Sequence, residues 1–145
     1  MSPALEVAIV SAGLSAVGAA LTFYVTKRAE RLDKLQQRKL EHYGQLMNAI
    51  SDLASDEVNQ REANERFNQA ANTIVLVAPQ RVIQALMEFH DEIRISNMSR
   101  SQAGHDNRLK ALVLALRESL DLPFADDPST FQFHLIGRKP PNVPS

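Results

Sequence analysis

The chain contains no cysteine and no tryptophan, and only five of its 145 residues are glycine. Without cysteine, disulfide bonds, thiolate metal sites and thiol catalysis are excluded. Two of the few glycines, Gly13 and Gly18, lie in an apolar segment, so little is left for a loop that cradles phosphate. No phosphate-binding loop, dinucleotide fingerprint or nucleophile elbow is present. The sequence therefore shows none of the motifs by which these enzyme classes are recognised.

The four histidines also lack the spacing of a helical metal site. None of them lies four residues from another, and none forms a Glu-x-x-His pair: His42, His90, His105 and His134. The nearest candidate is the segment EFHDE at 88–92, but adjacent positions of a helix point in different directions. We expect His90 to be structural, and we expect no catalytic site, no cofactor and no metal.

Charge is distributed unevenly although the formal net charge is only −1. Residues 27–39 carry six basic groups against two acids. This local excess follows an apolar segment, so it suits an anionic membrane surface better than nucleic acid, which needs a sustained basic patch with stacking aromatics. We expect four residues to contact lipid headgroups: Lys27, Arg28, Arg31 and Lys34.

Residues 7–25 (VAIVSAGLSAVGAALTFYV) form a run of nineteen residues without a charge. As a helix this run is roughly 28 Å long, close to the hydrocarbon thickness of a bilayer. A cleaved signal peptide would need a basic region before it, which Met1–Glu6 lacks. A soluble helix that is apolar on every face would need a much larger protein around it. Residues 1–27 are therefore expected to form a single transmembrane anchor in the cell (inner) membrane. The positive-inside rule places the N-terminus outside and the rest in the cytoplasm.

Small residues recur every four positions in this segment, in two neighbouring rows: Ala12, Ala16 and Ala20, and Ser11, Ser15 and Ala19. Such rows let helix backbones approach closely in lipid, which favours a homo-oligomer or contact with a protein partner. The alternative is that small residues are simply common in membrane helices.

No proline or glycine lies between Thr26 and Tyr43, so the apolar helix is expected to continue past the membrane. Apolar residues then recur at alternating steps of three and four, at Leu40, Tyr43, Met47, Ile50 and Ala54, and the stripe is widened by Leu46 and Leu53. This heptad-like seam is typical of an amphipathic helix that packs as in a coiled coil.

Three further helices are expected at 57–77, from 79 to about 95, and from 106 to about 121. Ser55-Asp56 and Asp106 are suitable N-cap residues, and 97–106 is expected to be a loop. The apolar stripes of the three helices are Ala63, Phe67, Ala70, Ala71, Ile74 and Val77; Val82, Ile83, Leu86, Met87, His90 and Ile93; and Leu109, Leu112, Val113, Leu116 and Leu120.

The expected fold class is all-α. The transmembrane helix continues into a small antiparallel bundle of three to four helices over residues 28–122, and residues 123–145 form an irregular tail that contains proline. The segment 130–136 is expected to be extended and to pack on the helices or on a partner.

This layout resembles uncharacterised small bacterial single-pass membrane proteins with a helical cytoplasmic domain. The resemblance is carried by the anchor and by three segments: LEHYGQLMNAI, APQRVIQALMEF and LKALVLALRESL. It implies no activity and no site residues.

The leading hypothesis is a non-enzymatic membrane protein that acts as an anchor, adaptor or accessory subunit through helix–helix contacts. One alternative is a phage-type envelope or lysis accessory protein. Another is an enzyme with a carboxylate/His site formed between helices.

Overall fold

The computed structural model describes residues 3–136, and it describes side chains for Pro3 and for 15–136. This part of the chain contains four α-helices and no strand: α1 (Pro3–Leu53), α2 (Gln60–Ile74), α3 (Gln80–Ile93) and α4 (Gln102–Ser119). The chain divides into two compact units, Met1–Gln37 and Arg38–Ser145. Because residues 3–136 contain helices and no strand, the all-α prediction is confirmed.

The first unit is described only through its part of α1. The prediction that the N-terminal helix continues without a break is confirmed, since α1 runs from Pro3 to Leu53. No helix of the described residues has a stretch long and apolar enough to cross a membrane. The expected span began at residue 7, and the side chains of 4–14 lie outside the described residues. The fold thus shows a helix over this segment but does not itself show a membrane span.

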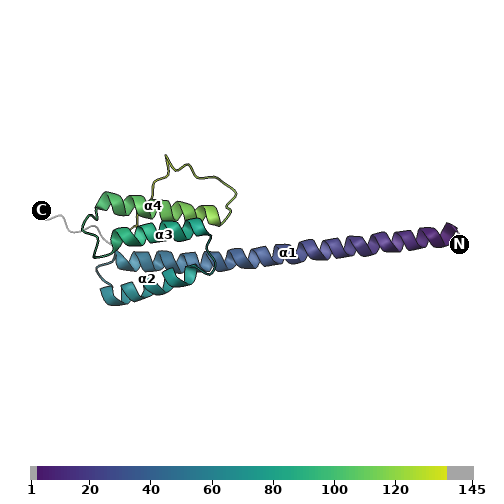
Figure 1. Ribbon diagram of the computed structural model, residues 1–145, viewed down its shortest axis with the longest axis horizontal. Helices are drawn as coiled ribbons and strands as arrows, with labels where there is room; N and C mark the ends of the chain where they lie inside the picture. The colour runs from purple at the N-terminus through teal and green to yellow at the C-terminus, as the bar shows by residue number, and fades with distance from the viewer. Residues whose placement is uncertain (1–2, 137–145) are drawn as a thin grey trace. The chain divides into compact units, whose positions relative to one another are not determined.

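In the second unit, the end of α1 and the helices α2, α3 and α4 lie side by side, and successive helices run in opposite directions (Figure 1). The predicted antiparallel bundle is therefore present, with four members. Its core consists of apolar side chains from all four helices, most of them fully buried: Tyr43, Leu46, Ala49, Ile50, Phe67, Ile74, Val82, Leu86, Phe89, Leu109, Leu112 and Leu116.

The apolar stripes of α2 and α4 were predicted correctly, whereas those of α1 and α3 need correction. On α1, Leu40 is 62% exposed although the heptad-like seam placed it inward, and Ala49 is buried. On α3, Met87 is 43% exposed and Phe89 takes the inward position. The predicted period was right, but each buried face is rotated around its helix axis relative to the predicted one.

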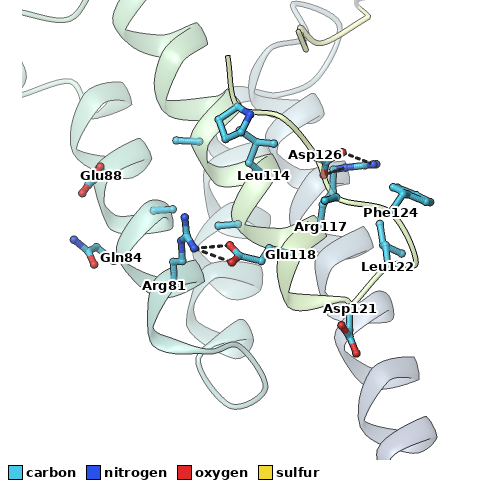
Figure 2. A pocket seen from close by; sticks show the side chains of 15 residues that line it. Arg81, Gln84, Glu88, Leu114, Arg117, Glu118, Asp121, Leu122, Phe124 and Asp126 are labelled. Carbon is cyan, nitrogen blue, oxygen red and sulfur yellow. Dashed lines mark hydrogen bonds and ion pairs between the residues drawn. The ribbon is translucent and has the colours of Figure 1, made fainter. Parts of the chain in front are cut away.

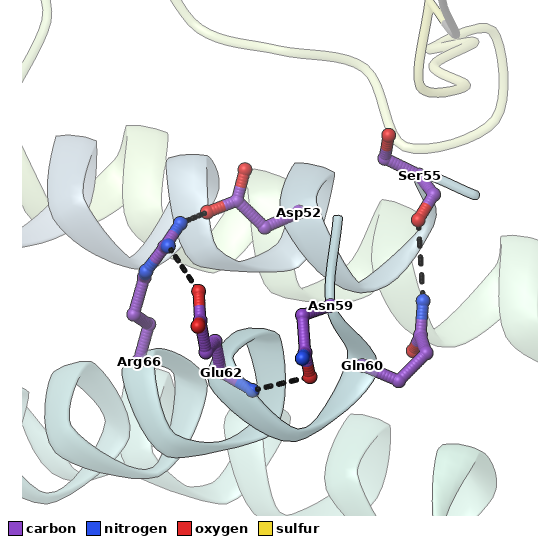
Figure 3. Close-up of polar contacts among 6 residues, drawn as sticks. All are labelled: Asp52, Ser55, Asn59, Gln60, Glu62 and Arg66. Carbon is purple, nitrogen blue, oxygen red and sulfur yellow. Dashed lines mark hydrogen bonds and ion pairs between the residues drawn. The ribbon is translucent and has the colours of Figure 1, made fainter. Parts of the chain in front are cut away.

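Helix α2 begins later than predicted. Its N-cap is Asn59, whose Oδ1 accepts hydrogen bonds from the backbone N–H groups of Arg61 (2.9 Å) and Glu62 (3.4 Å). Asn and Asp cap helices about equally well, so composition alone did not exclude the predicted start at Asp56. A polar network also joins α2 to the end of α1, since Arg66 reaches both Asp52 and Glu62 (Figure 3).

Helix α4 begins earlier than predicted. Ser101, not Asp106, is the N-cap, and its Oγ accepts a hydrogen bond from the N–H of Gly104 at 2.9 Å. Residues 102–106 are therefore helical, and only the first part of the predicted loop is a loop. Gly104 lies in the first turn beside Glu92, where a Cβ would be 2.8 Å from the Cδ of that side chain. A glycine at this position therefore permits the close approach of Glu92.

Helix α4 ends at Ser119, and Asp121 follows with a φ of 52°, the left-handed conformation common at helix ends. The described tail residues 122–136 then form no helix or strand. Phe131, Phe133 and Leu135 pack against the core. The irregular tail and its packing on the helices are thus confirmed as far as residue 136.

Candidate functional site

The apolar segment of the first unit, residues 15–25, has exposed side chains throughout. Its five large apolar side chains are each 60–66% exposed: Val17, Leu21, Phe23, Tyr24 and Val25. The segment therefore presents an apolar surface that extends around the helix.

The predicted packing rows lie partly within this segment. Ser15, Ala16, Ala19 and Ala20 are all exposed on α1, and the four-residue spacing places Ala16 above Ala20 and Ser15 above Ala19 on the helix surface. Ser11 and Ala12 lie outside the residues whose side chains are described. The described part of the rows thus lies on the exposed surface of α1.

The predicted headgroup residues follow directly in the sequence and are exposed. Steps of four and three place Lys27, Arg31 and Lys34 on one face of α1, with Arg28 beside them. The Lys27 Nζ lies 2.9 Å from a Glu30 carboxylate oxygen and 5.9 Å from the centre of the Phe23 ring. Within the described residues, no ion pair involves the other three basic side chains. This basic face can therefore accept an external anion.

A first groove of the second unit, the α3–α4 groove, has a volume of about 610 Å³ and lies between α3, α4 and residues 121–128. Figure 2 shows two ion pairs in it, Arg117 with Asp126 and Arg81 with Glu118. Arg117 donates to the two carboxylate oxygens of Asp126 at 2.7 and 2.9 Å. Its guanidinium also lies 5.3 Å from the ring centre of Phe124.

The Arg117–Asp126 pair fixes the tail to α4. The hydrogen bond from Arg117 lowers the pKa of the Asp126 carboxyl, and the same bond raises the pKa of the Arg117 guanidinium. Because the two arginines of the groove are already paired, with Asp126 and Glu118, the groove offers an anionic ligand no unpaired arginine. We interpret it as the anchoring point of the tail. Nothing in the local sequence pairs Arg117 with Asp126, so the sequence did not predict this ion pair.

Another contact that the sequence did not predict joins α1 to the end of α4. The hydroxyls of Tyr43 and Ser119 lie 2.7 Å apart, and Lys39 Nζ donates to the Ser119 carbonyl at 3.1 Å. A cation at this position satisfies a terminal carbonyl and opposes the negative end of the α4 dipole. Burial raises the pKa of Tyr43, an effect only partly offset by the hydrogen bond to Ser119.

The acid-rich segment around His90 does not converge on one point. Glu88 pairs with Arg108, and a Glu92 carboxylate oxygen accepts the Ser101 N–H at 3.0 Å. The His90 ring stacks on Phe67 instead, with ring centres 6.2 Å apart. The described residues contain no group of three or more His, Asp or Glu side chains suited to holding a metal ion.

No protein-family model, curated protein or solved structure matches this chain.

Proposed function

We propose that the chain is a non-enzymatic, single-pass membrane-anchored protein whose helical bundle acts as an anchor, adaptor or accessory subunit. The observation that carries the proposal is the sequence of surfaces along α1. Exposed large apolar side chains occupy residues 17–25, and an exposed basic face follows from Lys27. This is the order expected where a helix leaves the hydrocarbon core and meets anionic headgroups.

Burying the exposed apolar side chains of residues 17–25 in an apolar phase is energetically favourable. Fully burying one large apolar side chain contributes about 1.5–3 kcal/mol, and five such side chains are exposed here. The Thr22 hydroxyl already donates to the Gly18 carbonyl at 2.9 Å, so it can enter an apolar phase without losing its hydrogen bond. Phe23 and Tyr24 stand next to the basic face, as an interfacial aromatic belt would.

The membrane part of the proposal is testable because the chain has no native cysteine. We expect the full chain to stay in the membrane fraction after alkaline carbonate extraction. With an impermeant maleimide, S2C should be labelled in intact cells, whereas S99C on the exposed loop after α3 should be labelled only after permeabilisation. Release of the protein by carbonate would contradict the anchor, and labelling of S99C in intact cells would contradict the orientation.

The contact part of the proposal concerns the small-residue rows. Ala16→Leu adds bulk within a row, so it should reduce oligomers or co-purifying partner seen by native mass spectrometry. Val17→Leu enlarges a neighbouring apolar position outside the rows and is the matched control. If both variants behave like the parent chain, the rows are not a contact surface and the helix serves only as an anchor. If the parent chain is a lone monomer, the adaptor role is wrong.

A further inference from the structure

A second groove, which we call the histidine groove, opens at the end of the bundle where α1 and α3 end and α2 and α4 begin. It has a volume of about 810 Å³ and is lined by residues of all four helices and of the segment after α3. Small-molecule sites in proteins commonly have volumes of about 300–1,000 Å³. All of its lining residues belong to the second unit.

The floor of the histidine groove is aromatic. Phe67 and Phe89 are 2% and 1% exposed, and their rings meet edge to face with centres 6.4 Å apart. A histidine ring packs against each of them: His90 stacks on Phe67, and the centre of the His105 ring lies 5.6 Å from that of Phe89. Above these buried phenylalanine rings, the histidine rings and the side chains of Leu53, Ile93 and Ile95 give the groove an accessible apolar lining that suits a hydrocarbon or aromatic body.

The lining of the groove contains basic side chains but no acidic ones. Two arginines, Arg94 and Arg100, line the groove, and no aspartate or glutamate does, although the chain has 17 acidic residues. Arg94 lies 3.4 Å from Asp91, but no ion pair within the described residues involves Arg100. Apart from the two histidines, the remaining polar lining residues are three neutral amides and one serine: Gln60, Asn64, Asn68 and Ser96.

The nearby carboxylates are already engaged. Glu92 accepts the Ser101 N–H, and the Asp106 carboxylate lies 3.0 Å from His105 Nδ1 and 2.8 Å from the amide nitrogen of Gln102. Glu92 lies near Arg100, since both line a neighbouring pocket, but among the described residues neither Glu92 nor Asp106 forms an ion pair with Arg100 or lines the histidine groove. Ile95, which is 86% exposed, lines the groove and extends its apolar surface.

We propose that the histidine groove binds a small amphipathic organic anion, a monocarboxylate with an apolar body. The apolar body contacts the two histidine rings and the side chains of Leu53, Ile93 and Ile95, and Arg100 holds the carboxylate by charge-assisted hydrogen bonds. The lining is confined to one end of the bundle rather than running along a helix, so a compact ligand fits it better than a partner helix does.

The test uses protection of a single cysteine in the full chain, purified in lipid nanodiscs or, if it purifies without lipid, in buffer. The S96C variant places the thiol on the groove lining, and S99C places it on the exposed loop outside the groove. Phenylbutyrate is the probe, and phenylbutyramide is its uncharged counterpart. We expect phenylbutyrate to slow maleimide labelling of S96C but not of S99C.

The charge requirement is tested in the same assay. Arg100→Gln should raise the phenylbutyrate concentration needed for protection about tenfold, as expected for a lost charge-assisted hydrogen bond. Arg61→Gln removes an equal charge from α2 at a residue whose side chain is 88% exposed and outside the groove, so it should change nothing. The proposal is overturned if S96C is not protected, if the amide protects as well as the acid, or if Arg100→Gln and Arg61→Gln behave alike.

Discussion

Leu86 and Met87 are neighbours of similar size on α3, and the sequence alone placed both in the core. The structure separates them, since Leu86 is 0% exposed and Met87 is 43% exposed. Leu86→Ala removes three buried carbons, which at about 0.8 kcal/mol each amounts to about 2.4 kcal/mol. The cavity left behind raises the expected loss in free energy of unfolding to about 3–4 kcal/mol. Met87→Ala should cost about 1 kcal/mol or less, because that side chain is already partly in water.

The measurement is urea unfolding of the two variants and the parent chain, followed by far-UV circular dichroism. With a slope of about 1.5 kcal/mol per molar urea, Leu86→Ala should lower the midpoint by about 2 M, whereas Met87→Ala should lower it by well under 1 M, that is, by less than roughly 0.7 M. Equal losses in the two variants would refute the orientation of α3 described above. Equal losses are also what the sequence prediction implies, since it placed both side chains in the core.

Three further predictions concern the tail and the start of α2. Asp126→Asn should release the tail and speed amide exchange over residues 124–136, whereas Glu118→Gln, which breaks an exposed pair, should not; equal exchange in both would contradict the anchoring role. Because Arg117 lowers the pKa of Asp126, that carboxyl stabilises the tail fully above its ordinary pKa of 3.8 and progressively less as the pH falls through the lowered value. Protection of the tail amides, that is, their exchange rate relative to the intrinsic rate at the same pH, should therefore be lost only in acid below about pH 4, and a loss of protection already at neutral pH would count against the pair. Asn59→Ala should cost about 1 kcal/mol in thermal or urea unfolding and Asp56→Ala almost nothing, so the reverse order would show that α2 starts where the sequence suggested.

The number of helices and the inward faces of α2 and α4 could be predicted from the sequence because their apolar residues follow one period without competition. Phe67 and Ile74 on α2, and Leu109 and Leu116 on α4, are buried as the spacing indicated. The starts of α2 and α4 could not be predicted in the same way. Several residues of each segment cap well, and the choice depends on contacts with other helices, such as the close approach of Glu92 to α4.

The orientation of α1 shows the same limit of local pattern. Leu40, Tyr43 and Ile50 fit a heptad-like seam, but the face that meets α4 begins with Lys39 instead of Leu40. The cause is tertiary, because Lys39 binds the last carbonyl of α4, eighty residues further along the chain. Nor could the grooves be predicted, since residues distant in the sequence line both of them. The apolar segment 7–25 and the basic run 27–39, by contrast, could be recognised from composition alone.

The buried hydroxyl of Tyr43 provides an optical probe of the bundle. The chain has no tryptophan and only two tyrosines, so its near-ultraviolet signal comes from Tyr24 and Tyr43 among the strongly absorbing rings. Tyr24 is 64% exposed and Tyr43 is 3% exposed. Since burial raises the pKa of Tyr43, an alkaline spectrophotometric titration should show one phenol that ionises above the ordinary tyrosine range, and this late phase should disappear once the bundle opens. The native chain thus carries a spectroscopic reporter of its α1–α4 contact and needs no added label.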